Sequence, residues 1–442
     1  MLFSSVSFLF MYLPLALVGN TLLPGKLRLP FLFLISLVFY GWGEPSIVLL
    51  MVLSVLLSHL AALGMEKWPG RKKAILLVSV AVQLMMLGWF KYASAVIPGL
   101  RVALPAGISF YTFQAIGYNV DVYRGDVPAD RSFLRFGTFI SFFPQLIAGP
   151  IERYGDIAPQ LSAPKITWDN MAEGTRVFSI GLSKKLLLAN AAGQMWEALK
   201  TSPASNGTLG NWAAILAFAF QIYFDFSGYS DMARGLGLMM GVRLRENFNY
   251  PYTANSVTDF WRRWHMSLST WFRDYVYIPL GGNRKGLPRQ ILNILIVWGL
   301  TGLWHGASWN FVVWGLYYAL LLILDKVALL KLYRQLPKAL AFLPHVAALF
   351  FMLVGWAIFA FTDFTQMADF LKGLFSSSPA DGMALAYARD YTPLFIVCAL
   401  ASLPWKIKLP MLVKDLALCG LFVLCVAALV SQGFNPFLYF RF

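Results

Sequence analysis

The feature that most constrains this chain is the recurrence of long, uninterrupted apolar stretches along its length. An apolar stretch of about 20 residues can cross the hydrocarbon core of a bilayer as a helix. Hydrophobic residues make up 58% of the chain and charged residues 13%, roughly half the share of a soluble domain. The strands of a membrane β-barrel would alternate in hydrophobicity, whereas these stretches are continuous and longer. The pattern predicts an all-α polytopic membrane protein.

The stretches predict about 11 or 12 transmembrane helices, with re-entrant or interfacial helices where a stretch is too short to span. The best re-entrant candidate surrounds Pro144 and Gly149-Pro150. We find neither a fixed repeat nor an apolar-poor stretch of domain size, so 1–442 are expected to form one integral membrane domain. The apolar segments lie near 2–23, 30–42, 46–64, 74–92, 104–120, 136–150, 175–199, 211–233, 290–305, 308–325, 343–361, 391–404 and 416–433.

The net charge is +15, which in a soluble protein would suggest binding to nucleic acid. Here most of the charge lies in short loops between apolar segments, which fits the positive-inside bias of membrane proteins. Lys26, Arg28 and Lys406 then mark inner loops, and 41–45, without lysine or arginine, marks an outer one. The stretch 234–289 has nine basic residues against three acidic ones and is expected to face inward. The expected surroundings are membrane lipids, with no role for nucleic acid.

His305 is the most informative single residue. It lies in Leu-Trp-His-Gly, inside a strongly apolar stretch that runs over 291–324. An ionisable side chain at membrane depth is costly, so it is a candidate for function by default. Imidazole is also the usual group for moving protons near neutral pH. A structural hydrogen-bonding role is the alternative interpretation.

His265 lies in a second unusual sequence, Asp-Phe-Trp-Arg-Arg-Trp-His-Met-Ser, which mixes basic and aromatic residues. We treat it as a second catalytic candidate, again with a structural role as the alternative. The other two histidines, His59 and His345, have ordinary apolar neighbours and are expected to be structural.

The same region carries arginines interleaved with aromatic residues. Guanidinium groups pair with phosphate and stack on rings, so such a pattern suits an anionic, partly aromatic ligand such as an acyl-coenzyme A. The alternative is an interfacial belt, where tryptophan, tyrosine and arginine also accumulate. There is no phosphate-binding glycine loop. The candidates for donor binding are Trp261, Arg262, Arg263 and Arg273.

The acidic residues of the apolar region are interpreted differently. Asp225 and Asp231 lie in or beside an apolar helix, where buried carboxylates need partners, and arginine is the natural one. A metal site would need a third ligand beside the histidines. Asp259 and Asp274 could serve, but no metal-binding motif forms. We therefore expect no metal site and no permanently bound cofactor.

Taken together, the motifs resemble the membrane-bound O-acyltransferase family. The resemblance is to its bacterial branch, which includes the alginate O-acetylation membrane protein and the D-alanyl transfer protein of teichoic acid. It extends over most of the chain, and its densest part is about 217–320. The motifs that carry it are 104–114, 120–125, 142–153, 223–231, 247–252, 259–267 and 302–306.

The resemblance implies roles for several residues and partners. His305 matches the family's near-invariant catalytic histidine, and His265 matches the second catalytic position. The family has many helices around a central funnel or tunnel, where donor and acceptor meet from opposite faces. The implied donor is acetyl-coenzyme A or another acyl thioester, and the implied acceptor is a polysaccharide outside the bacterial cytoplasmic membrane. A lipase-like SGNH-hydrolase partner would complete the transfer.

Two functions from other classes stay open at this point. A transporter of polysaccharide or lipid-linked substrate also has intramembrane charges, broken helices and basic inner loops. A non-catalytic membrane scaffold of an exopolysaccharide machine is the other. The acceptor is equally open among alginate, cellulose, another exopolysaccharide, peptidoglycan and teichoic acid.

Overall fold

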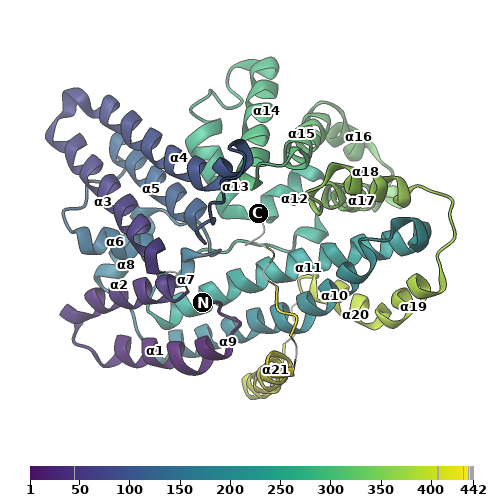
Figure 1. Ribbon diagram of the computed structural model, residues 1–442, viewed down its shortest axis with the longest axis horizontal. Helices are drawn as coiled ribbons and strands as arrows, with labels where there is room; N and C mark the ends of the chain where they lie inside the picture. The colour runs from purple at the N-terminus through teal and green to yellow at the C-terminus, as the bar shows by residue number, and fades with distance from the viewer. Residues whose placement is uncertain (44, 406–407, 432, 437, 439–442) are drawn as a thin grey trace. The chain divides into compact units, whose positions relative to one another are not determined.

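The computed structural model describes residues 1–43, 45–405, 408–431, 433–436 and 438 (Figure 1). Two positions used in the charge argument, Glu44 and Lys406, lie outside these residues. Within the described residues every regular element is helical, and none is a β-strand. This confirms the all-α prediction.

Contacts divide the chain into two compact units. Unit 1 comprises Met1–Leu182, Gly228–Glu246 and Asp415–Ser431, and unit 2 comprises Ser183–Ser227, Asn247–Lys414 and Gln432–Phe442. The long helix α11 (Pro203–Met239) contributes residues to both. The expectation of one integrated domain stays a prediction.

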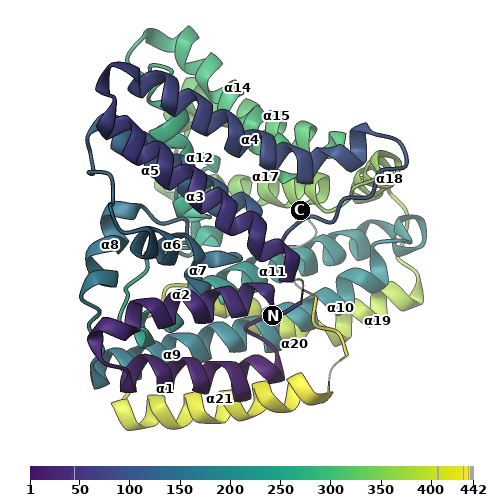
Figure 2. The ribbon, with the colours of Figure 1, turned by 60° about the vertical axis from the view of Figure 1, so that its left-hand side comes forward.

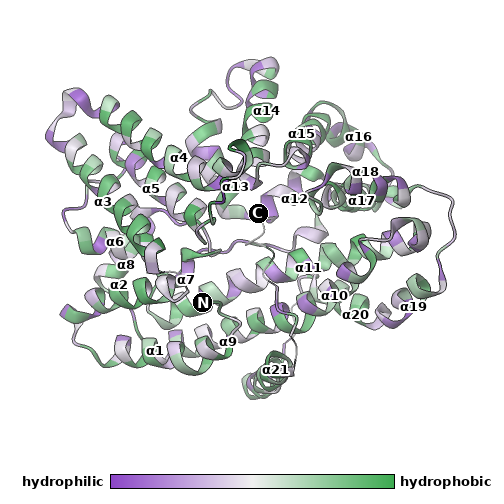
Figure 3. Ribbon diagram, in the orientation of Figure 1, coloured by the Kyte–Doolittle hydropathy of each residue, from purple (hydrophilic) through white to green (hydrophobic). Residues whose placement is uncertain are grey.

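Six helical stretches are long and apolar enough to cross a membrane, and a bent pair would make a seventh. Their side chains are largely apolar along the helix, as the hydropathy colours show (Figure 3). The chain is therefore a multi-pass membrane protein. The expected number of spans, about 11 or 12, is larger, because several apolar segments form shorter or broken helices. The stretches are Pro45–Lys67, Pro69–Val96, Pro203–Met239, Trp309–Gln335, Lys338–Phe359 and Met411–Ser431, and the pair is Gly382–Asp390 with Thr392–Ala401.

Unit 1 contains the N-terminal helices, of which α3, α4 and α5 pack together (Figure 2). Its elements are a π-helical turn Phe8–Tyr12, α1 (Leu13–Leu22), α2 (Gly25–Gly41), α3 (Pro45–Lys67), a 3₁₀ turn Pro69–Arg71, α4 (Lys72–Val96), α5 (Ile108–Arg124), α6 (Phe133–Ser141), α7 (Phe143–Leu146), α8 (Tyr154–Ser162), α9 (Trp168–Ser183), the end of α11 and most of α21 (Met411–Ser431).

The re-entrant candidate forms two short helices, α6 and α7, rather than one. The chain leaves the helix at Phe142, whose φ and ψ are −50° and 106°, just before Pro144. Pro144 lies in the first turn of α7, where its missing N–H costs no hydrogen bond, and it could not continue α6 because it cannot donate to the carbonyl of Ile140. Neither helix is long enough to span a bilayer. The sequence predicts one segment over 136–150, and its re-entrant path stays a prediction.

Small residues let α9 and the end of α11 approach closely within unit 1. A Cβ atom on Gly174 would lie 2.6 Å from the carbonyl oxygen of Gly235, and one on Gly181 would lie 2.5 Å from that of Gly228. Any larger residue would force the two backbones apart. This is the usual way in which membrane helices pack, because lipid supplies no hydrophobic drive between them.

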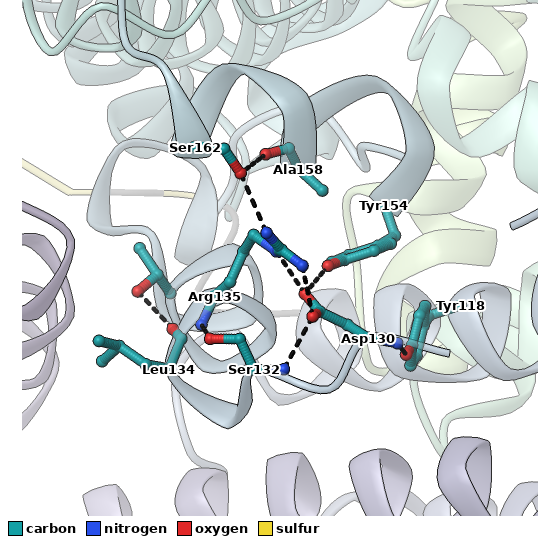
Figure 4. Close-up of polar contacts among 9 residues, drawn as sticks. Tyr118, Asp130, Ser132, Leu134, Arg135, Tyr154, Ala158 and Ser162 are labelled. Atoms are coloured by element: carbon teal, nitrogen blue, oxygen red, sulfur yellow. Dashed lines mark hydrogen bonds and ion pairs between the residues drawn. The ribbon is translucent and has the colours of Figure 1, made fainter. Parts of the chain in front are cut away.

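A buried carboxylate, Asp130, organises the loop before α6 (Figure 4). It accepts two hydrogen bonds of 2.6 Å from the guanidinium of Arg135, one of 2.8 Å from the backbone N–H of Ser132, and one from the hydroxyl of Tyr154. Burial alone would raise the pKa of this carboxyl, but the hydrogen bonds outweigh burial and hold the pKa below its usual range. The cluster fixes α5, α6 and α8 of unit 1 to one another.

Unit 2 contains the region that the sequence marks as functional. Its elements are a π-helical turn Lys184–Ala189, α10 (Asn190–Leu199), the first part of α11, a 3₁₀ turn Pro251–Thr253, α12 (Val257–Arg263), α13 (Met266–Phe272), a π-helical turn Arg273–Tyr277, α14 (Gly286–His305), α15 (Trp309–Leu324), a π-helical turn Asp325–Leu329, α16 (Leu330–Gln335), a 3₁₀ turn Lys338–Leu340, α17 (Leu343–Phe359), α18 (Phe364–Leu374), α19 (Gly382–Asp390) and α20 (Thr392–Ala401).

Candidate active site

Unit 2 encloses a cavity of about 310 Å³ whose walls are mostly apolar. Both candidate histidines line it, as do three of the four candidate donor-binding residues. The polar and charged lining residues are Asp225, Thr258, Arg262, His265, Ser269, Arg273, Tyr277, Thr301, His305 and Lys326. The cavity therefore combines an apolar passage with a small number of titratable groups, as ligand sites usually do.

One face of α14 forms the length of the cavity. Ile294, Val297, Thr301 and His305 recur at three- or four-residue intervals and all line it. At 1.5 Å per residue, the distance from Ile294 to His305 along the helix is about 16 Å. His305 is the last residue of α14, so it lies at one end of this passage.

The antiparallel packing of α15 on α14 defines what lies at each end. A Cβ atom on Gly302 would lie 2.4 Å from the carbonyl oxygen of Phe311, and one on Gly315 would lie 2.4 Å from that of Trp298. The start of α15 therefore lies beside His305, and its end lies beside the start of α14. Figure 2 shows the two helices side by side.

The end of the passage remote from His305 is basic. Lys326 follows α15 there, and Tyr277 accepts a hydrogen bond of 3.2 Å from Gln290 near the start of α14. Arg273 lies one turn before Tyr277 on the same π-helical segment. The side chain of Arg273 is 62% exposed, and its guanidinium pairs with Asp274 at 2.8 Å. The passage thus runs from a basic, accessible end to a histidine end.

His305 sits in an aromatic cage. Its ring centroid lies 4.5 Å from that of Trp304, 5.0 Å from that of Trp314 and 4.9 Å from that of Phe359. The imidazole is half-buried and faces the cavity. Such packing restricts the ring to few orientations, which a proton-transferring group requires.

His265 is more deeply buried, with 4% of its surface exposed. Its backbone is left-handed, with φ of 45° and ψ of 54°, at the residue that precedes α13. A non-glycine residue in this conformation is strained and is over-represented at functional sites. Burial lowers the pKa of His265 to about 3, so the ring is neutral at physiological pH.

Asn247 determines which nitrogen of His265 carries the proton. The side-chain oxygen of Asn247 accepts hydrogen bonds from the N–H and the hydroxyl of Ser267, at 3.1 and 2.9 Å, and lies 3.2 Å from Nδ1 of His265. Because an amide oxygen only accepts, Nδ1 donates to it. The neutral ring then keeps the lone pair on Nε2, the nitrogen that can accept a proton.

Trp304 connects the two histidines. Its ring centroid lies 6.4 Å from that of His265 and 4.5 Å from that of His305. The ring of Phe226, which lies on α11, packs against His265 with 4.7 Å between the ring centroids. Both histidines therefore occupy the same end of the passage, at the end of α14.

The structure separates the four candidate donor-binding residues. Trp261, Arg262 and Arg273 line the cavity, and the indole N–H of Trp261 has no acceptor among the described residues. Arg263 is not part of the lining. It pairs with Asp259 at 3.0 Å and donates to the hydroxyl of Thr253 at 3.2 Å. Adjacent arginines on a short helix thus face in different directions, which the sequence could not distinguish.

The prediction for Asp231 is confirmed, since it pairs with Arg234 at 3.3 Å. The prediction for Asp225 is wrong. Asp225 pairs with Lys185 at 2.7 Å, and both side chains are about 3% exposed. Lysine takes this place because its single ammonium group meets several acceptors that converge from different segments, which a planar guanidinium suits less well.

Sequence reasoning missed several residues of the site. Asn247 and Trp304 lie within the motifs that carried the resemblance, but nothing local indicated their contacts with the histidines. Tyr277 and Lys326 join the cavity only through the π-helical turns. Of the other histidines, His345 contacts the carbonyl oxygen of Ala254 at 3.0 Å and lines a separate apolar cavity. Among the described residues, no cluster of three metal-ligating side chains occurs.

Comparison with known proteins identifies one family for this chain. Residues 34–364 match the model of the membrane-bound O-acyltransferase family. A probable alginate O-acetylase of Azotobacter vinelandii is 37% identical over the full length of both chains. A peptidoglycan O-acetyltransferase of Helicobacter pylori is 32% identical over 85% of this chain and 80% of its own. A teichoic acid D-alanyltransferase of Bacillus subtilis is 31% identical over 49% of this chain and 57% of its own.

Proposed function

Because this chain belongs to the membrane-bound O-acyltransferase family and is an O-acyltransferase, we propose that it carries an acetyl group across the bacterial cytoplasmic membrane. The donor is a cytoplasmic thioester, acetyl-coenzyme A, and the acceptor is the hydroxyl of a polysaccharide outside. One observation carries the proposal: a single cavity has both histidines at one end and a basic mouth at the other.

The basic end suits the donor. Coenzyme A consists of a phosphorylated nucleotide joined to a long uncharged arm that ends in the thioester. Arg273 and Lys326 would attract the phosphates, and Arg262 adds a third positive charge to the lining. The apolar passage along α14 would accept the arm, and the indole N–H of Trp261 offers one hydrogen bond to an amide carbonyl of that arm. The thioester would then reach the histidine end.

His305 acts as the general base. It removes the proton from the acceptor hydroxyl as the oxygen attacks the thioester carbonyl carbon. The C–O bond forms, the C–S bond breaks, and the proton passes from His305 to the departing thiolate, which leaves as coenzyme A. The aromatic cage of Trp304, Trp314 and Phe359 holds the imidazole for both transfers.

His265 orients the reacting groups. Its low pKa makes protonation at neutral pH unfavourable, so it is poorly suited to donate a hydrogen bond from Nε2 to an oxyanion. The lone pair on Nε2, set by the contact between Nδ1 and Asn247, suits it to accept a hydrogen bond from a second, neighbouring hydroxyl of the acceptor. His265 would then hold the acceptor in place while His305 takes the proton of the attacking hydroxyl.

The acceptor side is inferred from the relatives. Two of them are named for O-acetylation of alginate or of peptidoglycan. We propose an extracellular polysaccharide as the final acceptor here, with alginate first among the choices. Transfer to it is either direct or through an SGNH-hydrolase-like partner outside the membrane.

The decisive experiment measures O-acetyl groups on the secreted polysaccharide of the host, in strains that express wild type, His305→Ala or His345→Ala at equal membrane levels. We expect His305→Ala to fall to the level of the deletion strain. His345→Ala removes the same ring from outside the cavity and should retain acetylation. If His305→Ala acetylates normally, the catalytic assignment is wrong and a transport or scaffold role becomes the better explanation.

A further inference from the structure

The described residues that follow α21, 433–436 and 438, belong to unit 2, and Leu438 supplies part of the cavity wall. Phe434, Asn435 and Pro436 form no regular structure, yet they are held by side chains from other elements. Leu438 is 4% exposed and lines the cavity. Residues 434–436 are half-buried, so the backbone groups that face the protein need partners.

Lys185 is the centre of these partners. Its side chain is 3% exposed, and its ammonium group lies 2.7 Å from Oδ1 of Asp225 and 2.9 Å from Oδ1 of Asn190. It also donates to the carbonyl oxygen of Pro436. The ammonium group therefore makes two hydrogen bonds and one ion pair with groups from three segments. A buried ion pair is costly to desolvate and adds little stability compared with an apolar core, so its value is better sought in positioning.

Asp225 and Asn190 also form hydrogen bonds with the backbone of the segment. The second oxygen of Asp225 accepts the backbone N–H of Leu438 at 2.9 Å, and the amide of Asn190 donates to the carbonyl oxygen of Phe434 at 3.2 Å. The Lys185–Asp225 pair therefore fixes the segment at several points. Each of these groups lies in unit 2.

The segment meets the cavity at the histidine end. Asp225 precedes Phe226 on α11, and the ring of Phe226 lies 4.7 Å from that of His265. Asp225, Phe226 and Leu438 all line the cavity. The acyl group of a donor whose thioester reaches the histidines would therefore lie against this wall.

We propose that the Lys185–Asp225 pair is a positioning device that holds Leu438 in the wall beside His265, and that Leu438 limits the acyl group to a short chain. This inference rests on the proposed function, because it assumes that the acyl end of the donor reaches the histidines. Leu438 is then the residue that determines specificity, and Lys185 acts through it.

The test compares acetyl- and butyryl-coenzyme A as donors, with alginate supplied as the acceptor of the acyl group, for the full-length protein purified into nanodiscs. The release of coenzyme A is followed with a thiol-reactive chromophore, and kcat/KM is obtained for each donor. Leu438→Ala should raise the ratio of kcat/KM for butyryl-coenzyme A to that for acetyl-coenzyme A at least about tenfold. One or two methylenes in a pocket change kcat/KM by about that factor. Lys185→Met should raise this ratio in the same direction.

Leu322→Ala is the matched control. It makes the same change in the same cavity at the basic end, so it should leave the ratio unchanged even if turnover falls. If Leu438→Ala is not folded by size-exclusion chromatography, Leu438→Val replaces it, with a smaller rise expected. An unchanged ratio in the folded Leu438 variant overturns the inference while acetyl transfer stands. If wild type releases no coenzyme A from acetyl-coenzyme A, the proposed function itself falls, and this inference with it.

Discussion

The side-chain oxygen of Asn247 lies 3.2 Å from Nδ1 of His265, and it also accepts two hydrogen bonds from Ser267. This one amide fixes the tautomer of the histidine and the start of α13. It connects a loop that precedes α12 to the ring that faces the cavity. A residue that orients a side chain of the site, as Asn247 orients His265, is often as important as that side chain.

We expect Asn247→Asp to change the pH dependence of donor consumption. Burial holds the pKa of His265 at about 3, so wild type should show no loss of activity from this ring between pH 8 and pH 5. A carboxylate beside Nδ1 favours the imidazolium and raises that pKa. The pH–rate profile of the variant should therefore gain an acid limb in this range. A profile with the shape of wild type would contradict the assigned contact.

Trp304 should be needed for turnover more than for folding, because its ring contacts both histidines. We expect Trp304→Ala to lower kcat about 100-fold, in line with a small misplacement of reacting groups, and Trp304→Phe to lose much less. Both are measured by release of coenzyme A. Trp168→Ala serves as the control, since Trp168 is 88% exposed in unit 1. Equal losses in Trp304→Ala and Trp168→Ala would remove the special role of Trp304.

The basic end should affect donor binding rather than chemistry. Arg273→Ala and Lys326→Ala should each raise KM for acetyl-coenzyme A about tenfold, because a charged hydrogen bond is worth about 1.5–3 kcal/mol. The effect on kcat should be small. The rise in KM should shrink at high salt, and it should vanish with acetyl-pantetheine, which lacks the nucleotide. Arg263→Ala should raise KM less, because Arg263 pairs with Asp259 outside the lining.

Asp130 should stabilise unit 1 in a pH-dependent way. Its folded-state pKa is depressed, so its contribution is complete above the unfolded pKa of about 3.9 and is lost as pH falls through the folded value. Asp130→Asn should lower the melting temperature at pH 7, and the difference from wild type should shrink only as the pH falls below about 3.9. Asp126→Asn, at an exposed turn, should leave it unchanged. Equal melting temperatures for Asp130→Asn and wild type at pH 7 would show that the cluster in Figure 4 does not stabilise the fold.

The sequence alone was sufficient for the all-α membrane class and for singling out the two histidines that line one cavity, whose catalytic role stays a prediction. Burial of long apolar stretches in lipid, and the cost of placing an imidazole there, depend on local composition, which can be read residue by residue. These inferences need no knowledge of which segments meet.

The tertiary structure decided everything that depends on contacts between distant segments. Arg262 and Arg263 are neighbours in sequence, yet one lines the cavity and the other pairs with Asp259, because the orientation of a short helix is set by what packs on it. Lysine rather than arginine pairs with Asp225 because three segments bring their acceptors to one point. Composition and motifs fix which groups are costly to bury, whereas only the packed fold determines which partner satisfies each of them.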